Sequence, residues 1–242
     1  MTLTVTAPVD TGVITLDAGP WGTRDVQWGL SWEHGTAAYW LEATRRATQA
    51  QQPDRHRLTE TLCDEVALCM LGGFGMPYEL ALAAYTELHA RVLSHTRAPS
   101  EADIAEVLLQ PLRVGAAMRR YRFPHQRAQR LSAALTYLNA NVHPTSALEM
   151  RDFLTGAPGI GLKTASWIVR NRWPEAQVAI LDVHVLRAGA RAQVFPRGVA
   201  AQSSYHYLEA LFVAWAGQEH VHTADLDATI WAEEADRARR PF

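Results

Sequence analysis

A turn with three glycines in six residues joins two helical segments of the chain. The stretch 145–172 reads TSALEMRDFLTGAPGIGLKTASWIVRNR, in which Gly156, Gly159 and Gly161 separate two runs of apolar residues at helical spacing. Glycine permits positive φ and lets another backbone approach closely, so this stretch predicts a tight helix–turn–helix unit. The second helix should begin near residue 162, where its unpaired N–H groups would converge on one point and suit a phosphate.

The only lysine of the chain follows this turn. The 23 basic residues are 22 arginines and Lys163. Arginine is the better bidentate partner of phosphate, whereas lysine can lose its proton and act as a nucleophile. Because a GC-rich genome would also favour arginine, the position of Lys163 has to carry the argument. Two helices joined in this way can hold a DNA backbone without reading its sequence, and the alternative is a plain turn with a glycine C-cap.

The rest of the chain is mainly helical. Residues 1–20 contain two short β-prone runs and predict a hairpin, and the aromatic stretch 26–46 continues as a helix. The polar stretch 51–56 marks a lobe boundary. Further helices are expected at about 58–71, 77–94, 100–109, 124–139, 145–155, 162–172, 182–193, 203–217 and 223–238.

These elements predict a mainly α, two-lobed chain with a small N-terminal β hairpin. We expect residues 1–57 to form a hairpin and a helix that pack with the C-terminal lobe. Residues 58–185 should form a helical lobe that contains the glycine-rich turn, and residues 186–242 a C-terminal helical lobe.

Composition excludes several classes of protein. The 242 residues are 48% hydrophobic with a formal charge of −2, which excludes a strongly basic nucleic-acid coat but not a local basic face. Cys63 and Cys69 cannot supply the four thiolates of an iron–sulfur cluster or a cysteine-rich zinc site, and we expect two core residues of a reducing cytosol. The chain has neither a membrane-length apolar run nor a signal-peptide pattern, so we expect a cytoplasmic protein without membrane association.

A second motif lies downstream of the turn. The stretch VAILDVHVLRAG, 178–189, places Asp182 nineteen residues after Lys163. Together the two motifs resemble the helix-hairpin-helix DNA glycosylases with a Gly-Pro-Asp signature, the superfamily of endonuclease III and the 8-oxoguanine DNA glycosylases. Their hairpin reads P-G-x-G-x-K-T-A, as in 158–165 here, and a later V/L-D-x-H segment matches 181–184. The resemblance implies that Lys163 is the nucleophile and Asp182 the essential carboxylate.

Two further stretches resemble one branch of this superfamily. Endonuclease III-type enzymes carry four cysteines near the C-terminus, and this chain has none after Cys69. The stretches YRFPHQRAQRL, 121–131, and DLDATIWAEEADRARR, 225–240, are similar to segments of archaeal-type 8-oxoguanine DNA glycosylases. The resemblance covers about 58–240. It implies a two-lobed helical glycosylase fold, double-stranded DNA with a damaged base as partner, a monomer, and a location at the nucleoid.

The implied chemistry assigns one role to each residue. The damaged nucleotide must leave the duplex to be reached. Asp182 would stabilise the positive charge that develops on the sugar when the bond to the base breaks. A neutral Lys163 would attack C1′ and form a Schiff base, after which β-elimination cleaves the strand. The structural alternatives are a surface ion pair for Lys163 and a helix N-cap for Asp182, and an N-cap is compatible with catalysis.

The charge pattern and the resemblance also predict contacts with DNA. Five arginines occur between 119 and 130 without an acid among them, which favours a phosphate-binding face over an ordinary solvated helix. Phe74 stands between glycines in GGFGMP and could fill the space left by the base, or pack as a loop aromatic. His184 could bind the phosphate of the extruded nucleotide or be a solvated or core histidine. The expected DNA-binding residues are Gly159, Gly161, His184, Phe74, Arg119 and Arg122.

The resemblance also implies a base pocket and an ion site. The pocket candidates are Trp167, which could equally be a core residue, Trp231, Asp225 and Asp227. A monovalent cation, K⁺ or Na⁺, would bind the carbonyls of Thr155, Ala157 and Ile160, and no other cofactor is expected. We expect a bifunctional glycosylase and AP lyase that removes 8-oxoguanine. The alternatives are the same chemistry on another modified base, and a non-catalytic DNA-binding module.

Overall fold

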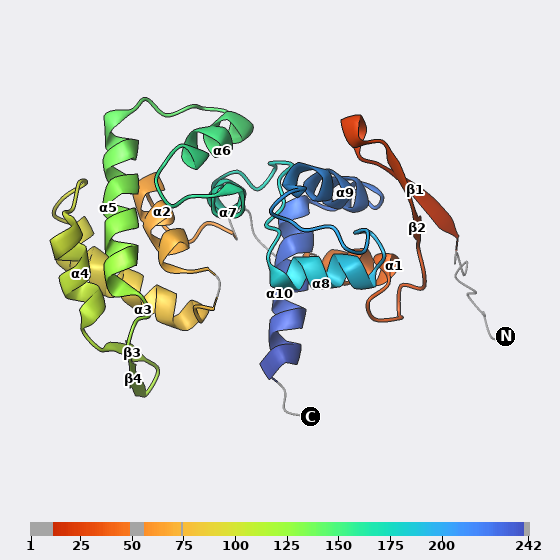
Figure 1. The fold of residues 1–242 in the computed structure, drawn as a ribbon. Coiled ribbons are helices and arrows are strands. Elements are labelled where there is room, and N and C mark those ends of the chain that lie inside the picture. Colours follow the sequence, from red (N-terminus) through yellow and green to blue (C-terminus); the bar gives the residue numbers. More distant parts are fainter. Residues whose placement is uncertain (1–11, 49–55, 74, 240–242) are drawn as a thin grey trace. The chain divides into compact units, whose positions relative to one another are not determined.

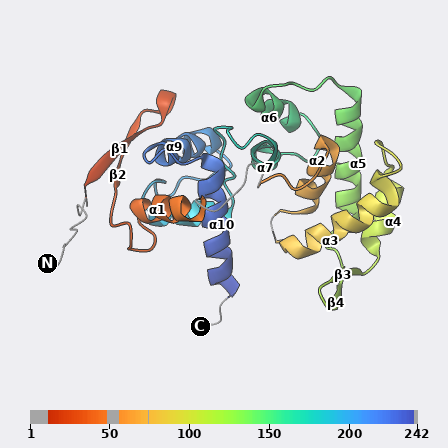
Figure 2. The ribbon, with the colours of Figure 1, turned by 180° about the vertical axis from the view of Figure 1, so that it is seen from behind.

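The computed structural model describes residues 12–48, 56–73 and 75–239 (Figure 1). Helices dominate these residues, and the described strands form two short antiparallel hairpins (Figure 2). The chain divides into two compact units: Met1–Arg55 with Pro174–Phe242 is the first, and His56–Trp173 is the second. None of the helices in the described ranges combines the length and the apolar character needed to span a bilayer. The mainly helical fold expected from the sequence is confirmed.

In the second unit, side-chain caps and proline decide where helices begin. The Thr61 hydroxyl accepts the Asp64 N–H at 3.1 Å, and Ser100 forms a capping box with Asp103. Pro124 opens the longest helix of this unit because its fixed φ suits the first helical position. The elements are α2 (Leu62–Leu71), α3 (Tyr78–Leu88), the π-helical turn η2 (His89–Leu93), α4 (Glu101–Leu109), β3 (Leu112–Val114), β4 (Ala117–Arg119), α5 (Pro124–Ala140), α6 (Ala147–Thr155) and α7 (Leu162–Arg172).

The core of the second unit lies around α5. This helix packs against α2 and α4 with one apolar stripe, and burying each leucine of the stripe stabilises the unit by about 1.5–3 kcal/mol. The spacing of three and four residues explains why one face of α5 is apolar while the other carries arginine and glutamine. The buried residues of the stripe are Ala128, Leu131, Ala134, Leu135 and Leu138.

The first unit combines the N-terminal hairpin with helices from both ends of the chain. Trp40 and Trp215 are fully buried, and the Trp215 indole N–H donates to the Ala37 carbonyl at 3.2 Å. The Arg24 guanidinium fastens the hairpin by donating to the carbonyl of Val194 at 2.9 Å. The elements are β1 (Val13–Asp17), η1 (Gly19–Trp21), β2 (Thr23–Gln27), α1 (Ala37–Thr48), α8 (Val183–Arg191), α9 (Tyr205–Gly217) and α10 (Thr223–Arg239).

Several expected elements differ from the observed ones. The hairpin pairs 13–17 with 23–27, so its second strand follows the segment we expected, while residues 1–11 lie outside the described part. The tryptophans at 28 and 32 precede α1 rather than join it, because positive φ at Gly29 and Gly35 interrupts the chain there. The sequence also missed the β3–β4 hairpin, whose strands of three residues are too short to show an alternating pattern.

The boundary between the two units differs from the one expected after residue 185. The observed change follows Trp173, because the segment before α8 belongs to the first unit. Its Ala179 N–H donates to the buried Glu209 carboxylate at 3.0 Å, and the Ala179 carbonyl accepts the Tyr205 hydroxyl at 2.6 Å. These bonds tie the residues in front of α8 to α9.

Candidate active site and DNA-binding surface

The turn between α6 and α7 requires glycine at one of its two expected DNA-binding positions. Gly159 has a φ of +84°, and a Cβ there would lie 2.9 Å from the Arg130 side chain. Gly161 has ordinary backbone geometry and open space around it, and it is the N-cap of α7 without any side-chain cap bond. The first N–H groups of α7 therefore receive no capping side chain from Gly161 and can face an anion.

Lys163 is the second residue of α7 and is half-buried. Burial raises the pKa of the Cys69 thiol well above its usual value, Glu65 adds to this effect, and the charges of Arg170 and Lys163 oppose it. The ammonium group of Lys163 thus lies within electrostatic reach of Cys69 on α2. The amine stands at the positive end of a helix, next to the turn.

Trp167 packs within the second unit one helical turn after Lys163. A Cβ added to Gly72 would lie 3.1 Å from the Trp167 ring, so the ring rests on the backbone where α2 ends. Trp167 is half-buried. Its position on α7 is the one expected, and its stacking on a base stays a prediction.

Asp182 is the N-cap of α8 in the first unit. Its Oδ1 accepts the N–H of His184 at 2.8 Å and that of Val185 at 2.9 Å. The side chain is half-buried, and both bonds use the same oxygen, so Oδ2 takes part in neither. The cap fixes the direction of the carboxylate, as an electrostatic role requires. The Nδ1 atom of His184 is buried and has no hydrogen-bond partner among the described residues.

Two side chains just before α5 and one in its first turn hold the end of α2 and the loop that follows it. The Tyr121 hydroxyl donates to the Leu71 carbonyl at 2.6 Å, and Arg127 donates to the Gly72 carbonyl at 3.1 Å. Arg122 donates to the Gly75 carbonyl at 3.0 Å. Burial raises the pKa of Tyr121 to about 12, against the charge of Arg127, so the phenol remains a donor. Two of the five arginines therefore hold a loop.

An exposed aromatic residue stands beside these contacts. Phe123 is 64% exposed and has a φ of +58°, which costs a non-glycine residue about 1–3 kcal/mol. The Arg122 guanidinium lies 5.5 Å from the centre of its ring. We had expected Phe74 to be the inserting aromatic, but Phe74 lies outside the described residues. The sequence did not single out Phe123, because its exposure and its left-handed backbone depend on the folded chain around it.

The expected base-pocket residues of α10 fall into two groups. Asp225 and Asp227 are 4% and 3% exposed, so neither carboxylate lies open at the surface. Trp231 is 39% exposed. On α10, the indole ring of Trp231 is therefore more accessible to a ligand than the carboxylates of Asp225 and Asp227.

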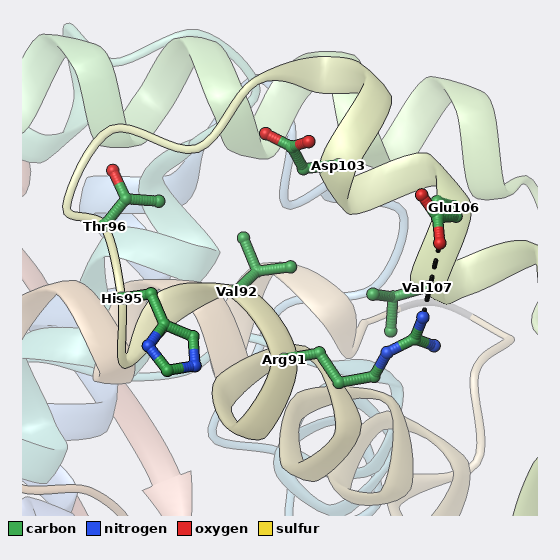
Figure 3. A pocket seen from close by; sticks show the side chains of 7 residues that line it. All are labelled: Arg91, Val92, His95, Thr96, Asp103, Glu106 and Val107. Carbon is green, nitrogen blue, oxygen red and sulfur yellow. Dashed lines mark hydrogen bonds and ion pairs between the residues drawn. The ribbon is translucent and has the colours of Figure 1, made fainter.

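A surface pocket lies between η2 and α4, on elements that do not carry the glycine-rich turn (Figure 3). Its charged groups already have partners, because Arg91 pairs with Glu106 at 3.3 Å and Asp103 belongs to the capping box of α4. Among the described residues, no cluster of histidine, cysteine, aspartate or glutamate has the form of a metal site. Neither this pocket nor a metal site among the described residues therefore competes with the glycine turn as the candidate site.

Comparison with known proteins identifies relatives by sequence. Residues 44–220 match the profile of a family described as 8-oxoguanine DNA glycosylase, Ogg-HhH. An 8-oxoguanine DNA glycosylase/AP lyase of Metallosphaera sedula is 28% identical over 116 residues, which make up 46% of this chain and 57% of that protein. The chain thus spans little more than half the length of this curated relative.

Solved structures share the fold. The 8-oxoguanine DNA glycosylase of Thermotoga maritima is 22% identical with a TM-score of 0.53, over 81% of this chain and 88% of that one. The 8-oxoguanine glycosylase/lyase of Methanocaldococcus jannaschii, in complex with 15mer DNA containing 8-oxoguanine, is 18% identical with a TM-score of 0.54, over 84% and 91%. Since the family profile extends from α1 to the residues after α9, the chain belongs to the 8-oxoguanine DNA glycosylase family.

Proposed function

We propose that the protein removes 8-oxoguanine from double-stranded DNA and then cleaves the strand as an AP lyase. The observation that carries this proposal is the placement of its single lysine. Lys163 is the second residue of a helix that starts directly after a glycine turn, in a chain of the 8-oxoguanine DNA glycosylase family. The name of the Metallosphaera sedula relative supports both activities.

Asp182 stabilises the charge that develops on the sugar. When the bond between C1′ and the base nitrogen breaks, positive charge accumulates at C1′ and the ring oxygen. A carboxylate held by two backbone N–H groups cannot turn away from that charge, so little reorganisation is needed during the reaction.

Lys163 forms the covalent intermediate. Its Nζ attacks C1′ as the base departs. The bond between C1′ and the ring oxygen then breaks, the ring oxygen takes up a proton, and a Schiff base with the opened sugar remains. Proton removal from C2′ breaks the bond between C3′ and its oxygen, which is β-elimination. The half-buried amine stands in the first turn of α7, directly after the glycine turn.

A panel of duplexes tests the substrate assignment. We expect strand cleavage of a duplex with 8-oxoguanine and of one with an abasic site, and none of an undamaged duplex. Cleavage of another modified base in preference to 8-oxoguanine would move the proposal to that base. Binding of all duplexes without cleavage would instead leave a DNA-binding module.

The DNA-binding surface of the second unit follows one face of α5. The Arg130 side chain covers Gly159 of the turn. Arg127 lies three residues before Arg130 on the same face of α5, and it donates to the Gly72 carbonyl. Phe123 stands one further turn toward the start of α5. The glycine turn, these arginines and the exposed ring thus form a continuous surface, and we propose that the DNA backbone lies along it.

Arg119 tests the backbone contact. Its side chain is exposed on β4. Arg119→Gln should weaken lesion and undamaged duplexes equally and reduce the slope of log affinity against log salt by about 1, as loss of one phosphate contact does. Fluorescence anisotropy at several salt concentrations measures both quantities. The matched control is Arg97→Gln, an exposed arginine outside the arginine run, and an equal effect of both variants would refute a specific contact.

Phe74 and Phe123 are the candidates for the space that the base leaves. One of the two variants, Phe123→Ala or Phe74→Ala, should weaken lesion-duplex binding more than undamaged binding, because a wedge acts only after the base has left the stack. For the residue that inserts we expect about a tenfold loss, equivalent to about 1.4 kcal/mol. Met118→Ala removes another exposed apolar side chain from the β3–β4 hairpin and serves as the control. An unchanged lesion preference in both phenylalanine variants would exclude both wedges.

We also propose that the turn binds a monovalent cation through the carbonyls of Thr155, Ala157 and Ile160. The Ala157 carbonyl accepts the Ile160 N–H at 3.2 Å, which still leaves it one lone pair for an ion. Neutral carbonyl oxygens suit K⁺ or Na⁺. Bound there, the ion would offset phosphate charge next to the helix.

A further inference from the structure

A buried carboxylate joins α2 to the helix that carries Lys163. Glu65 has no exposed surface, although glutamate is almost never fully buried without partners. Its Oε1 accepts the Asn171 amide at 2.6 Å, and its Oε2 accepts the Thr59 hydroxyl at 2.9 Å and the Thr59 N–H at 3.2 Å. The mechanism above gives no role to any of these three side chains.

The hydrogen bonds among Glu65, Asn171 and Thr59 leave one buried polar atom without a partner among the described residues. Asn171 is 1% exposed, and its Oδ1 is buried without a hydrogen-bond partner in the described ranges. A buried oxygen left unpaired destabilises the fold. The amide cannot turn over to satisfy it, because Oδ1 would then face the Glu65 carboxylate. The bond to Glu65 therefore decides how the last turn of α7 sits on α2.

The contact with Trp167 provides a second fixed point on α7. The first turn of α2 meets the last turn of α7 at Asn171, while the end of α2 at Gly72 meets Trp167 in the middle of α7. The two helices therefore pack against each other at two places. One contact alone would leave α7 free to roll or slide, whereas two contacts fix both motions. Lys163 precedes Asn171 by eight residues, which is about 12 Å along the helix.

We propose that Glu65 and Asn171 are positioning residues, which set the register of α7 and thereby hold the Lys163 amine at the distance its attack requires. This inference rests on the proposed function of Lys163. Apolar packing tolerates small shifts along a helix, but a charge-assisted hydrogen bond of 2.6 Å does not. A nucleophile displaced by about 1 Å can lose about 10²-fold in rate while substrate binding is kept.

Exchange of the two side chains tests the proposal. Asn171→Asp places two carboxylates together and should push α7 from its register. We expect single-turnover cleavage at saturating lesion duplex to fall about 10²-fold, with the Kd for an abasic-site duplex within about threefold of wild type. In the double variant Glu65→Gln with Asn171→Asp, the amide introduced on α2 can donate to the carboxylate introduced on α7, while the oxygen of that amide accepts from Thr59. The bond is then restored with its direction reversed, and cleavage should return to within about fivefold of wild type.

Rates are compared per folded molecule, because a merely stabilising cluster would lower Tm and leave the rate of the folded protein unchanged. Thr44→Val is the control for lost stability, since it removes a buried hydroxyl bond to Trp40 in the other unit. Wild-type cleavage by folded Asn171→Asp, or a double variant as slow as the single one, overturns the proposal. If Asn171→Asp does not fold, Glu65→Gln replaces it and should be slower than wild type, and an unchanged rate overturns the proposal equally. A wild-type protein that cleaves no lesion defeats the proposed function itself, and the positioning role with it.

Discussion

Replacement of Lys163 by glutamine should abolish strand cleavage. Glutamine has similar length but no nucleophilic amine, so no Schiff base can form with C1′. We expect cleavage of an 8-oxoguanine duplex to fall by at least about 10³-fold, while binding of the same duplex changes by less than about tenfold. Single-turnover cleavage and anisotropy titrations with the same labelled duplex measure the two effects.

Lys163→Arg separates nucleophilicity from charge. Arginine keeps the positive charge beside the turn, but its guanidinium does not deprotonate in proteins. The arginine variant should bind as wild type does and still fail to cleave. Cleavage by this variant would show that Lys163 acts only through its charge.

Asp182→Asn should slow base excision by about 10³-fold or more, because the sugar charge loses its counter-charge in the transition state. The substitution suits this test because asparagine is as good an N-cap as aspartate. Its side-chain oxygen can accept the same two N–H groups of α8, so the first unit should keep its stability. Release of the free base in single-turnover experiments measures the excision rate.

The stability of the Asp182→Asn variant is the control for this experiment. A Tm close to wild type with slow excision assigns the effect to charge. Excision near the wild-type rate would contradict the role of Asp182 in catalysis and leave it the cap of α8 alone.

Local patterns predicted the helices well. The segment 162–172 coincides with α7, and 124–139 differs from α5 by one residue. In both cases the apolar spacing and the flanking glycine or proline act within a few residues, so the sequence carries the whole signal. Prediction failed where the determinant is conformational, as at Gly29 and Gly35, whose positive φ keeps Trp28 and Trp32 out of the helix that begins at Ala37.

The sequence motifs name the candidate residues of the site, but they do not reveal the contacts that hold those residues in place. An N-cap was the structural alternative for Asp182, compatible with catalysis; the cap is observed, and the catalytic role stays a prediction. The arginines of 119–130 were expected to form a phosphate-binding face, and that role stays a prediction. The sequence did not reveal that Arg122 and Arg127 donate to carbonyls of a loop about fifty residues earlier, which only the folded chain brings within reach.

The same limit explains Phe123 and Glu65. A left-handed phenylalanine is imposed by the chain around it, since local preference opposes that conformation. A buried glutamate looks like any charged helical residue until its partner on another helix is known, and Asn171 lies 106 residues away. Contacts between distant segments therefore define the parts of the site that the motifs do not contain.

Borohydride trapping tests the central claim most directly. Reduction during turnover of an 8-oxoguanine duplex should freeze a covalent protein–DNA adduct, and peptide mapping should place the adduct on Lys163, the only lysine of the chain. The adduct should disappear in Lys163→Gln. An adduct that persists in this variant, or that maps to the N-terminal amine, would contradict the assignment of Lys163 as the nucleophile.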